Sequence, residues 1–373
     1  MKNFVKTITV VLIIAILGIL LHPTYAKTAQ KELTIVSWGG AFTKSQILAQ
    51  VIPYEKKTGT HIEVIDYNGG LKELRAQVSS HNTKWDLVDM YLPDIIRASK
   101  EGLLEKIDIT SLPSAPDGTP AKKDFLKGTL MDYGVGNTVS SNVIVYNSEK
   151  FKKNSPKTIA DFFDLKKFPG KRGLRISSRI NLEWALIADG VSIDKVYKTL
   201  STDKGVERAF KKLDTIKKHI VWWESGAEPA QFLAEEKVVM SSAWNGRVQS
   251  AIDKGKKITI LWDAQVWEFD LWCIPKRTRK QNIKEIMDFL KFATDSERLA
   301  NVTKYIAYGP ARKSSASLIS SDTKDKLPTA LRNSKNTLKL DGEWWAKNQK
   351  KMDAKFAHWK ALKGLSFGGG LRP

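Results

Sequence analysis

Three side chains have the chemistry and the local setting of a ligand contact. Trp38 ends an alternating, β-branched run just before Gly39 and Gly40, so its indole falls at the end of a predicted strand. Trp244 precedes an Asn-Gly pair, which predicts a tight turn that exposes the ring. Asp270 lies among apolar residues, where a carboxylate without a partner is costly to bury. Aromatic faces attract cations and carboxylates pair with ammonium groups, so these residues predict binding of an amine-bearing solute.

Catalytic chemistry has little support in the sequence. It contains no GxSxG, HExxH or Walker pattern, and its histidines are scattered at positions 22, 61, 81, 219 and 358. The lone cysteine, Cys273, lies in the apolar string Leu271–Ile274 and is predicted to be a buried strand residue. A catalytic thiol would need a polar, basic setting. We therefore expect a binding protein with no enzyme activity, metal or cofactor.

The positive charge of the chain raises a second possible class of function, nucleic-acid binding. The chain of 373 residues carries a formal charge of +21, which invites a nucleic-acid or anionic partner. The lysines are spread along the sequence, however, and no RNA-recognition, zinc-finger or helix-turn-helix pattern accompanies them. A solvated, lysine-rich surface is the favoured interpretation, with no nucleic-acid partner.

The first 26 residues have the pattern of an export signal. Lys2 and Lys6 precede an apolar run over about 8–21, and Thr24-Tyr25-Ala26 supplies small residues at a cleavage site. An uncleaved N-terminal anchor is the alternative, but the run is shorter than the roughly 20 residues that span a membrane. No cysteine stands at the cleavage site to accept a lipid. These features predict a protein released into a periplasm after cleavage near Ala26.

The remaining chain alternates between strand and helix patterns, which predicts α/β architecture with mostly parallel, doubly wound sheets. In such sheets ligands bind beyond the carboxyl ends of the strands, so the ends at Trp38–Gly40 and Asp89–Tyr91 are candidate positions. Predicted strands cover 33–38, 61–67, 85–90, 141–147, 238–242, 258–262 and 269–275. Predicted helices cover 42–58, 71–80, 182–189, 205–218, 283–292 and 343–362.

A set of short motifs follows one another in a fixed order and spacing along about residues 31–362. They are Ile35-Val36-Ser37-Trp38, Trp85-Asp86-Leu87-Val88, Val143-Ile144-Val145-Tyr146-Asn147, Phe162-Phe163-Asp164, Phe168-Pro169-Gly170-Lys171-Arg172, Trp244-Asn245-Gly246, Phe269-Asp270, Ile274-Pro275 and Tyr308-Gly309-Pro310. In these motifs the chain resembles the solute-binding proteins of ABC importers, specifically the spermidine/putrescine-binding family.

The resemblance implies a two-lobed periplasmic binding protein that closes on its ligand about a hinge and then docks on a membrane permease. Lobe I would take 31–138 and about 275–340, and lobe II 139–272. A C-terminal helix over 341–362 and a flexible tail over 363–373 would follow. We expect a monomer that binds a polyamine. The expected ligand-binding residues are Trp38, Gly39, Tyr91, Trp244, Arg247, Glu268, Asp270 and Tyr308.

Arg247 departs from the family pattern. An acidic or small polar residue follows this turn in the polyamine binders, and the acidic pair of the spermidine type is also not evident here. A guanidinium suits a carboxylate, so a zwitterionic or acidic ligand such as an amino acid or opine is an open alternative. A further alternative is that Arg247 takes no part in binding, because its side chain points out of the cleft or pairs with Glu268 or Glu183.

Overall fold

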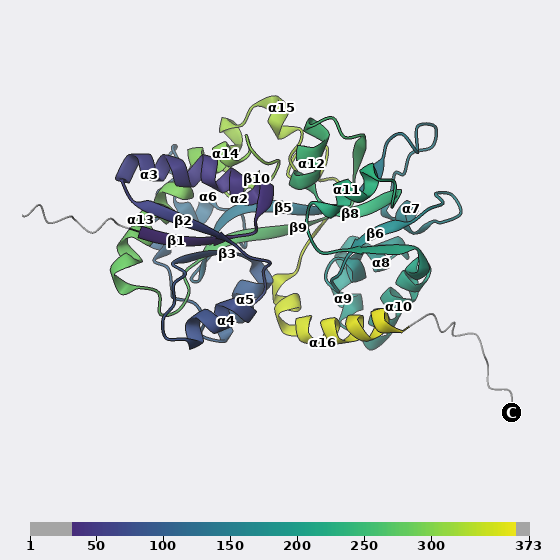
Figure 1. Cartoon of the computed structure of the whole chain (residues 1–373), viewed down its shortest axis with the longest axis horizontal. Coiled ribbons are helices and arrows are strands. Elements are labelled where there is room, and N and C mark those ends of the chain that lie inside the picture. Colours follow the sequence, from purple (N-terminus) through teal and green to yellow (C-terminus); the bar gives the residue numbers. More distant parts are fainter. Residues whose placement is uncertain (1–31, 363–373) are drawn as a thin grey trace, which may run out of the picture. The chain divides into compact units, whose positions relative to one another are not determined.

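The computed structural model describes residues 32–362 (Figure 1). The predicted signal peptide (1–26) and C-terminal tail (363–373) lie outside this range. Within it, no helix has the length and apolar character needed to cross a membrane.

The first lobe is built on three parallel strands. Their order is β2-β1-β3, and β1 and β3 are buried almost throughout because both faces of the sheet are covered. The strands are β1 (Glu32–Ser37), β2 (His61–Asp66) and β3 (Leu87–Tyr91). The helices that follow them are α2 (Gly40–Gln46), a π-helical turn (Ile47–Val51), α3 (Ile52–Thr58), α4 (Lys72–Ser79) and α5 (Leu92–Lys100).

Two long antiparallel strands connect the lobes. These are β5 (Gly134–Asn147) and β9 (Ile258–Cys273), and they pair with each other along most of their length. The sequence predicted a shorter strand for β5 and two separate strands for β9. The two predicted strands are one because Ile258–Leu261 and Val266–Trp272 both pair with β5, on either side of a register shift between Asn142 and Ile144. Ala264 lies in this interruption and takes a positive φ of 54°. The chain therefore passes between the lobes within these two strands.

The second lobe repeats the parallel arrangement. Strand β6 (Arg172–Arg175) pairs in parallel with both β7 (Ile220–Trp223) and β8 (Met240–Trp244), and β8 pairs antiparallel with β5. Helices surround this sheet (Figure 1). They are α7 (Ile159–Phe163), α8 (Asn181–Ala188), α9 (Val196–Leu200), α10 (Asp203–Asp214), α11 (Glu228–Ala234) and α12 (Asn245–Asp253).

Short elements and three longer helices complete the fold. The short strands are β4 (Leu130–Met131), β10 (Gly309–Pro310) and β11 (Thr337–Lys339). The helices are α6 (Ala121–Asp124), α13 (Ile283–Ala293), α14 (Ser296–Val302), α15 (Ser321–Lys324) and α16 (Gly342–Ala361). The 3-10 turns are Ile109–Ser111, Ile193–Lys195, Lys217–His219, Lys280–Asn282 and Ser314–Leu318.

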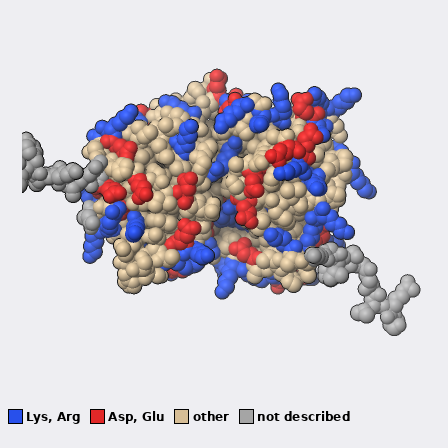
Figure 2. Space-filling model, viewed as in Figure 1, with Lys and Arg blue, Asp and Glu red and all other residues tan. Residues whose placement is uncertain are grey.

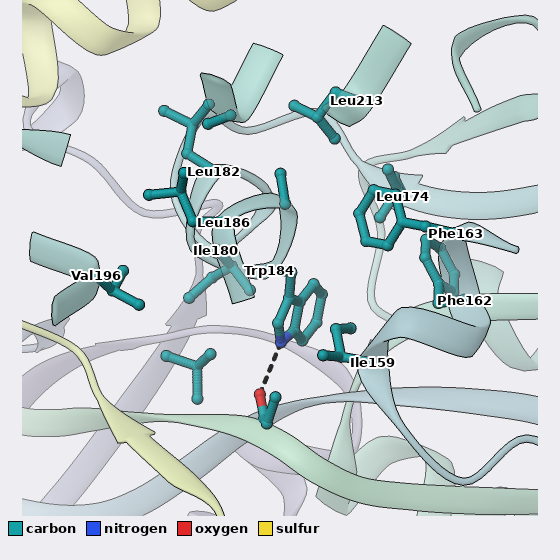
Figure 3. Close-up of a cluster of buried hydrophobic side chains, with 14 of the residues drawn as sticks. Ile159, Phe162, Phe163, Leu174, Ile180, Leu182, Trp184, Leu186, Val196 and Leu213 are labelled. Carbon is teal, nitrogen blue, oxygen red and sulfur yellow. Dashed lines mark hydrogen bonds between the residues drawn. The ribbon is translucent and has the colours of Figure 1, made fainter. Parts of the chain in front are cut away.

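Each lobe has its own hydrophobic core. The first-lobe cores combine residues of 33–135 with residues of 271–311, whereas the main second-lobe core combines 144–266 with 338–359. In the latter, Trp184 lies among aliphatic side chains and donates a hydrogen bond from its indole nitrogen to the Ala264 carbonyl at 2.8 Å (Figure 3). Leu338 and Trp345 also belong to it, so β11 and α16 pack with the second lobe.

Cys273 is a free, fully buried thiol in β9, as its apolar surroundings predicted. Burial, and to a smaller extent the nearby Asp89, raise the pKa of this thiol well above its ordinary value. A thiol in this setting is held in its unreactive, protonated form.

Candidate functional site

A pocket of about 730 Å³ opens where the two lobes face each other. It is lined by residues at the carboxyl ends of strands β1, β2, β6, β7 and β8, the position where ligands bind in open parallel sheets. Figure 2 shows the surface hollowed between the two halves, with basic atoms inside the hollow and acidic atoms beside it. The lining residues are Trp38–Gly40, Asp66–Asn68, Arg175, Ile176, Glu224–Ala227, Trp244 and Arg247.

Trp38 and Gly39 enter the pocket from the first lobe, directly after β1. The partly buried Trp38 ring lies 4.4 Å from the ring of Tyr91 and 5.1 Å from that of Tyr67, measured between centroids. Its Nε1 donates a hydrogen bond to Asp89 Oδ1 at 3.0 Å. Tyr91 is buried behind Trp38 and does not line the pocket itself.

Asp89 is the buried carboxylate that orients Trp38. Its Oδ2 accepts hydrogen bonds from Gln46 Nε2 at 2.7 Å and from Asn137 Nδ2 at 2.9 Å. Desolvation raises the pKa of Asp89 to about 7, while the hydrogen bonds from Asn137, Trp38 and Gln46 oppose that rise.

Trp244 lines the pocket from the second lobe, but its setting differs from the prediction. The Asn-Gly pair that follows it begins helix α12 directly and makes no exposed turn. The ring is only 7% exposed and packs edge-on against Trp223 at 5.3 Å. Trp244 is therefore a core residue of the second lobe as well as a wall of the pocket.

Arg175 is a pocket residue that the sequence analysis missed. It ends strand β6, and its guanidinium carbon lies 4.7 Å from the centroid of the Trp244 ring. Among the described residues, none accepts a hydrogen bond from this guanidinium or forms an ion pair with it. Burial lowers the pKa of Arg175 from its ordinary value, and the neighbouring Tyr91 opposes that shift.

Arg179 is a second missed residue. Its Nε lies 3.5 Å from Glu268 Oε1, and its guanidinium carbon lies 5.3 Å from the centroid of the Tyr91 ring. Strand β6, which ends at Arg175, was not among the strands predicted from the sequence. The rule that ligands bind at carboxyl ends of strands would otherwise have pointed to Arg175.

Arg247 lies in the pocket and contacts the opposite lobe. Its Nη2 donates hydrogen bonds to the backbone carbonyls of Trp38 at 3.0 Å and Gly39 at 3.1 Å. The alternative partners considered from the sequence were wrong, since Glu268 pairs with Arg179, and Glu183 accepts hydrogen bonds from residues around α8 and α16.

Glu268 and Asp270 lie on β9, behind the pocket, and are almost fully buried. Glu268 Oε2 accepts a hydrogen bond from Asn142 Nδ2 at 2.6 Å, and Asp270 Oδ2 accepts one from Thr138 Oγ1 at 3.2 Å. Burial, and then the nearby Asp89 carboxylate, raise the pKa of Asp270 well above its ordinary value. No described cation forms an ion pair with Asp270.

Tyr308 is buried next to Arg247, where the lobes meet. Its ring lies 5.5 Å from that of Phe42, and Gly246 lies against it so closely that an added Cβ would be 2.6 Å from Tyr308 Cε1. Burial raises the pKa of Tyr308, and the Arg247 guanidinium opposes that rise.

Four buried polar atoms in this region have no hydrogen-bonding partner among the described residues. They are Trp244 Nε1, Arg247 Nε, Arg179 Nη1 and Glu268 Oε1. Buried polar atoms in folded proteins are nearly always partnered, so a cluster of exceptions calls for an explanation. Glu268 Oε1 faces Arg179 Nε at 3.5 Å as an ion pair, so the three donors are the atoms left for a ligand, and they are suited to one that carries acceptors.

A larger hollow of about 1340 Å³ lies along α10 and α16, away from the strand ends. Its lining is largely the lysine-rich outer face of α10 and the last turns of α16, and it includes none of the expected ligand-binding residues. This composition is that of a solvated helix surface.

Comparison with known proteins agrees with the two-lobed fold. The chain is 36% identical to the gamma-aminobutyric acid-binding protein of Pseudomonas aeruginosa over 336 residues, which cover 90% of this chain and 93% of that protein. The structure of PBP MotA from A. tumefaciens B6 in complex with glucopine matches with a TM-score of 0.81 and 30% identity, covering 88% of this chain and 99% of MotA. The structure of the Atu4243-GABA receptor matches with a TM-score of 0.78 and 30% identity. The match covers 90% of this chain and 100% of that chain.

Similarity to a polyamine transport protein is weaker. The spermidine/putrescine substrate-binding protein PotD from Streptococcus pneumoniae is 16% identical with a TM-score of 0.67, which supports the shared fold alone. The relatives are substrate-binding proteins of transporters and not enzymes. The family model for bacterial extracellular solute-binding proteins matches residues 49–330. The chain therefore belongs to the bacterial extracellular solute-binding protein family and is a substrate-binding component of an ABC transporter.

Proposed function

We propose that this protein is periplasmic and captures a small solute that carries both an amine and a carboxylate, such as 4-aminobutanoate or an opine. It would act as a monomer, close on the solute and release it to a membrane permease, with no nucleic-acid partner. The ligand class replaces the polyamine that the sequence resemblance implied, and keeps the zwitterion that Arg247 had suggested as the alternative.

The observation that carries the proposal is the unpaired guanidinium of Arg175. Arg175 is partly exposed to the pocket, and a ligand that fills the pocket would take its guanidinium out of water, at a cost of several kcal/mol unless the ligand supplies a counter-charge. A ligand carboxylate would supply that charge and two hydrogen bonds, because the planar guanidinium matches a carboxylate in bidentate geometry. The Trp244 ring beneath Arg175 would fix the plane of the guanidinium.

The amine end has its own candidate partners. Trp38 offers an aromatic face that lines the pocket, and Asp270, behind the lining, is a buried carboxylate with no described cation beside it. An ammonium group near Asp270 would lower the raised pKa of that carboxyl and favour its charged form. Glu268 is already engaged with Arg179.

A polyamine remains the second candidate, favoured by Asp270 and the aromatic rings. Against it, a ligand cation 4 Å from the Arg175 guanidinium would meet a repulsion of about 4 kcal/mol at an effective dielectric constant of 20. That cost would offset a good ammonium–carboxylate contact. The names of the relatives with at least 30% identity, which mention GABA and glucopine, also favour the zwitterion.

Calorimetric titration with 4-aminobutanoate, glucopine, putrescine and spermidine tests the proposal. We expect the wild-type protein to bind one of the first two most tightly, and Arg175→Ala to weaken that binding about 100-fold. The matched control is Arg208→Ala, which removes an exposed arginine paired with Asp189 on the second lobe and should leave affinity unchanged. Tighter binding of putrescine or spermidine by the wild type, or unchanged binding by Arg175→Ala, would refute the proposal.

A further inference from the structure

We infer that Gly342 is a positioning residue for solute binding, which acts through a contact between the lobes outside the pocket. The contact joins the start of α16, a helix that packs with the second lobe, to α5 of the first lobe (Figure 1). The missing side chain at Gly342 lets the two helices meet. The inference rests on the proposed closure of the lobes on a solute, and it is independent of the class of that solute.

Helix α16 is fixed to the second lobe along its length. Its Trp345 Nε1 donates a hydrogen bond to Glu183 at 2.6 Å, and its Asp353 accepts one from Ser178 Oγ at 2.6 Å. Its apolar face belongs to the main second-lobe core through Trp345, Met352, Phe356 and Trp359. We therefore expect α16 to move with the second lobe when the lobes open or close.

The first residues of α16 contact the other lobe. Gly342 is buried, and a Cβ added to it would lie 2.9 Å from Leu92 Cδ2 and Cγ and 3.3 Å from Ile96 Cδ1. Beside it, Glu343 Oε2 forms an exposed ion pair with Lys100 Nζ at 3.4 Å. The φ of Gly342 is not positive, so a larger residue there meets no backbone strain. It would instead push α5 and α16 apart, because packed interiors have no room for the added atoms.

This contact lies between the pocket and the strands that connect the lobes. The strand order on the first-lobe side is β2-β1-β3-β9, in which β9 passes between the lobes and β1 and β2 end at the pocket. Leu92 begins α5 directly after β3, the strand next to β9. The pocket ends of β1 and β2 lie one and two strands farther from β9. A small separation at Leu92 should therefore open a wider gap at the pocket, as hinge motion about β5 and β9 requires.

The contact also bears on the first-lobe wall of the pocket. Leu92 follows Tyr91, whose ring lies 4.4 Å from that of Trp38. A side chain at position 342 that displaced Leu92 would shift Tyr91 and the Trp38 ring packed on it. Gly342 itself does not line the pocket, so its influence on binding passes through the lobe contact and this ring pair.

Gly342→Val places a wedge at the contact. We expect 4-aminobutanoate to dissociate about 10-fold faster from this variant, with little change in association, because incomplete closure lowers the population that holds the solute. Leu92→Ala makes room for the added side chain, so the double variant should recover most of the loss. Leu92→Ala alone completes the double-mutant cycle. An unchanged dissociation rate in Gly342→Val, or no recovery in the double variant, would overturn the inference.

The matched control is Ala354→Val, which adds the same side chain at an exposed position of α16 and should leave dissociation unchanged. Urea denaturation of the variants separates a positioning role from a structural one. A Gly342→Val protein that loses stability but keeps the wild-type dissociation rate would make Gly342 a packing residue only. If the valine variant does not fold, Gly342→Ala takes its place, because its single added Cβ already meets Leu92 at 2.9 Å.

Carbodiimide coupling of Lys100 to Glu343 measures the contact itself, with peptide mass spectrometry as the readout. We expect a several-fold higher yield with bound solute than without, a lower yield in Gly342→Val, and recovery in the double variant. The pair Lys284–Asp288 within α13 is the internal control and should couple equally in all samples. Equal Lys100–Glu343 yields with and without solute, or in wild type and Gly342→Val, would refute a contact that forms on closure.

Failure of the ligand proposal would not obscure these tests. If the wild type binds putrescine in preference to 4-aminobutanoate, the proposed function fails, and dissociation and coupling are then measured with putrescine. The same four proteins and the same expected order of rates apply to that solute, because Gly342 does not touch the pocket.

Discussion

Asp89 accepts a hydrogen bond from the indole nitrogen of Trp38 at 3.0 Å, and this bond fixes the edge of a ring that lines the pocket. The carboxylate is itself held by Gln46 and Asn137, whose amides donate to its other oxygen. Trp38 is thus oriented by a buried polar network of the first lobe, while one of its faces contacts Tyr91. Such a ring is preorganised for ligand contact, which reduces the entropy cost of binding.

This relationship predicts a graded effect of substitutions at Trp38. Trp38→Phe keeps an aromatic face but loses the hydrogen bond, so affinity should fall a few-fold. Trp38→Ala loses the face as well and should weaken binding more than tenfold, at a stability cost of about 2 kcal/mol. The control is Trp344→Ala, because Trp344 is also partly buried, donates to Ser201 Oγ at 2.8 Å and lies on α16. Calorimetry and urea denaturation check both quantities, and equal losses of affinity at Trp38 and Trp344 would contradict a site role for Trp38.

Trp244 should behave differently from Trp38, because it is nearly fully buried and packs against Trp223. Trp244→Ala is expected to lower the free energy of unfolding by about 3–5 kcal/mol, as for other buried tryptophans. Trp244→Phe should retain most of this stability, so that its affinity reports on ligand contact. Guanidinium denaturation of the ligand-free variants provides the measurement. Unchanged stability of Trp244→Ala would mean that the ring does not belong to the core.

Much of the fold could be predicted because local patterns specify it. The alternation of β-branched residues marks β1, and apolar spacing marks α13 and α16, so these elements were found within a few residues of their ends. The position of Trp38 at a strand end also led directly to the pocket. Local patterns do not reveal that β9 is continuous, because its two halves belong to different lobes and look like separate strands in the sequence.

The missed parts of the site depend on contacts between distant segments. Arg175 ends a strand of only four residues, too short for periodicity to reveal. The partners of Arg247 are backbone carbonyls, which any sequence supplies, so residue types could not identify them. Asp270 was selected for the cost of burying its charge. The structure places it behind the pocket lining, because β9 runs through the interior of the sheet.

Asp270→Asn should weaken amine binding by about 10- to 100-fold while leaving stability unchanged or slightly higher. The carboxyl is buried beside Asp89 and its pKa is raised, so the folded protein gains little from keeping it charged. If a ligand ammonium approaches Asp270, it favours the charged carboxylate, so binding should release protons wherever the free protein holds Asp270 protonated, and this release should disappear in Asp270→Asn. Titration calorimetry in buffers of different ionisation enthalpy measures the protons released. Equal release by wild type and variant would place the amine elsewhere.

We expect Glu183 to make the stability of the second lobe dependent on pH. It is fully buried in α8 and accepts hydrogen bonds from Ile180 N at 2.8 Å, Trp345 Nε1 at 2.6 Å and Tyr197 OH at 3.1 Å. Desolvation nevertheless raises its pKa from 4.5 to about 7. The folded state thus holds a proton that the unfolded chain loses above pH 4.5.

The sign of the pH effect follows from this proton. Between about pH 4.5 and 7 the native state binds more protons than the unfolded state, so the free energy of unfolding falls as the pH rises. The raised pKa contributes about 3 kcal/mol below pH 4.5, and this contribution is lost by about pH 7. The glutamine in Glu183→Gln cannot titrate. From pH 4.5 to 7 the free energy of unfolding of this variant, relative to that of the wild type, should therefore rise by about 3 kcal/mol. Urea denaturation from pH 4.5 to 8 gives the comparison, with the exposed Glu207→Gln on α10 as control. Parallel stability curves for wild type and Glu183→Gln would show that Glu183 keeps an ordinary pKa in the folded protein.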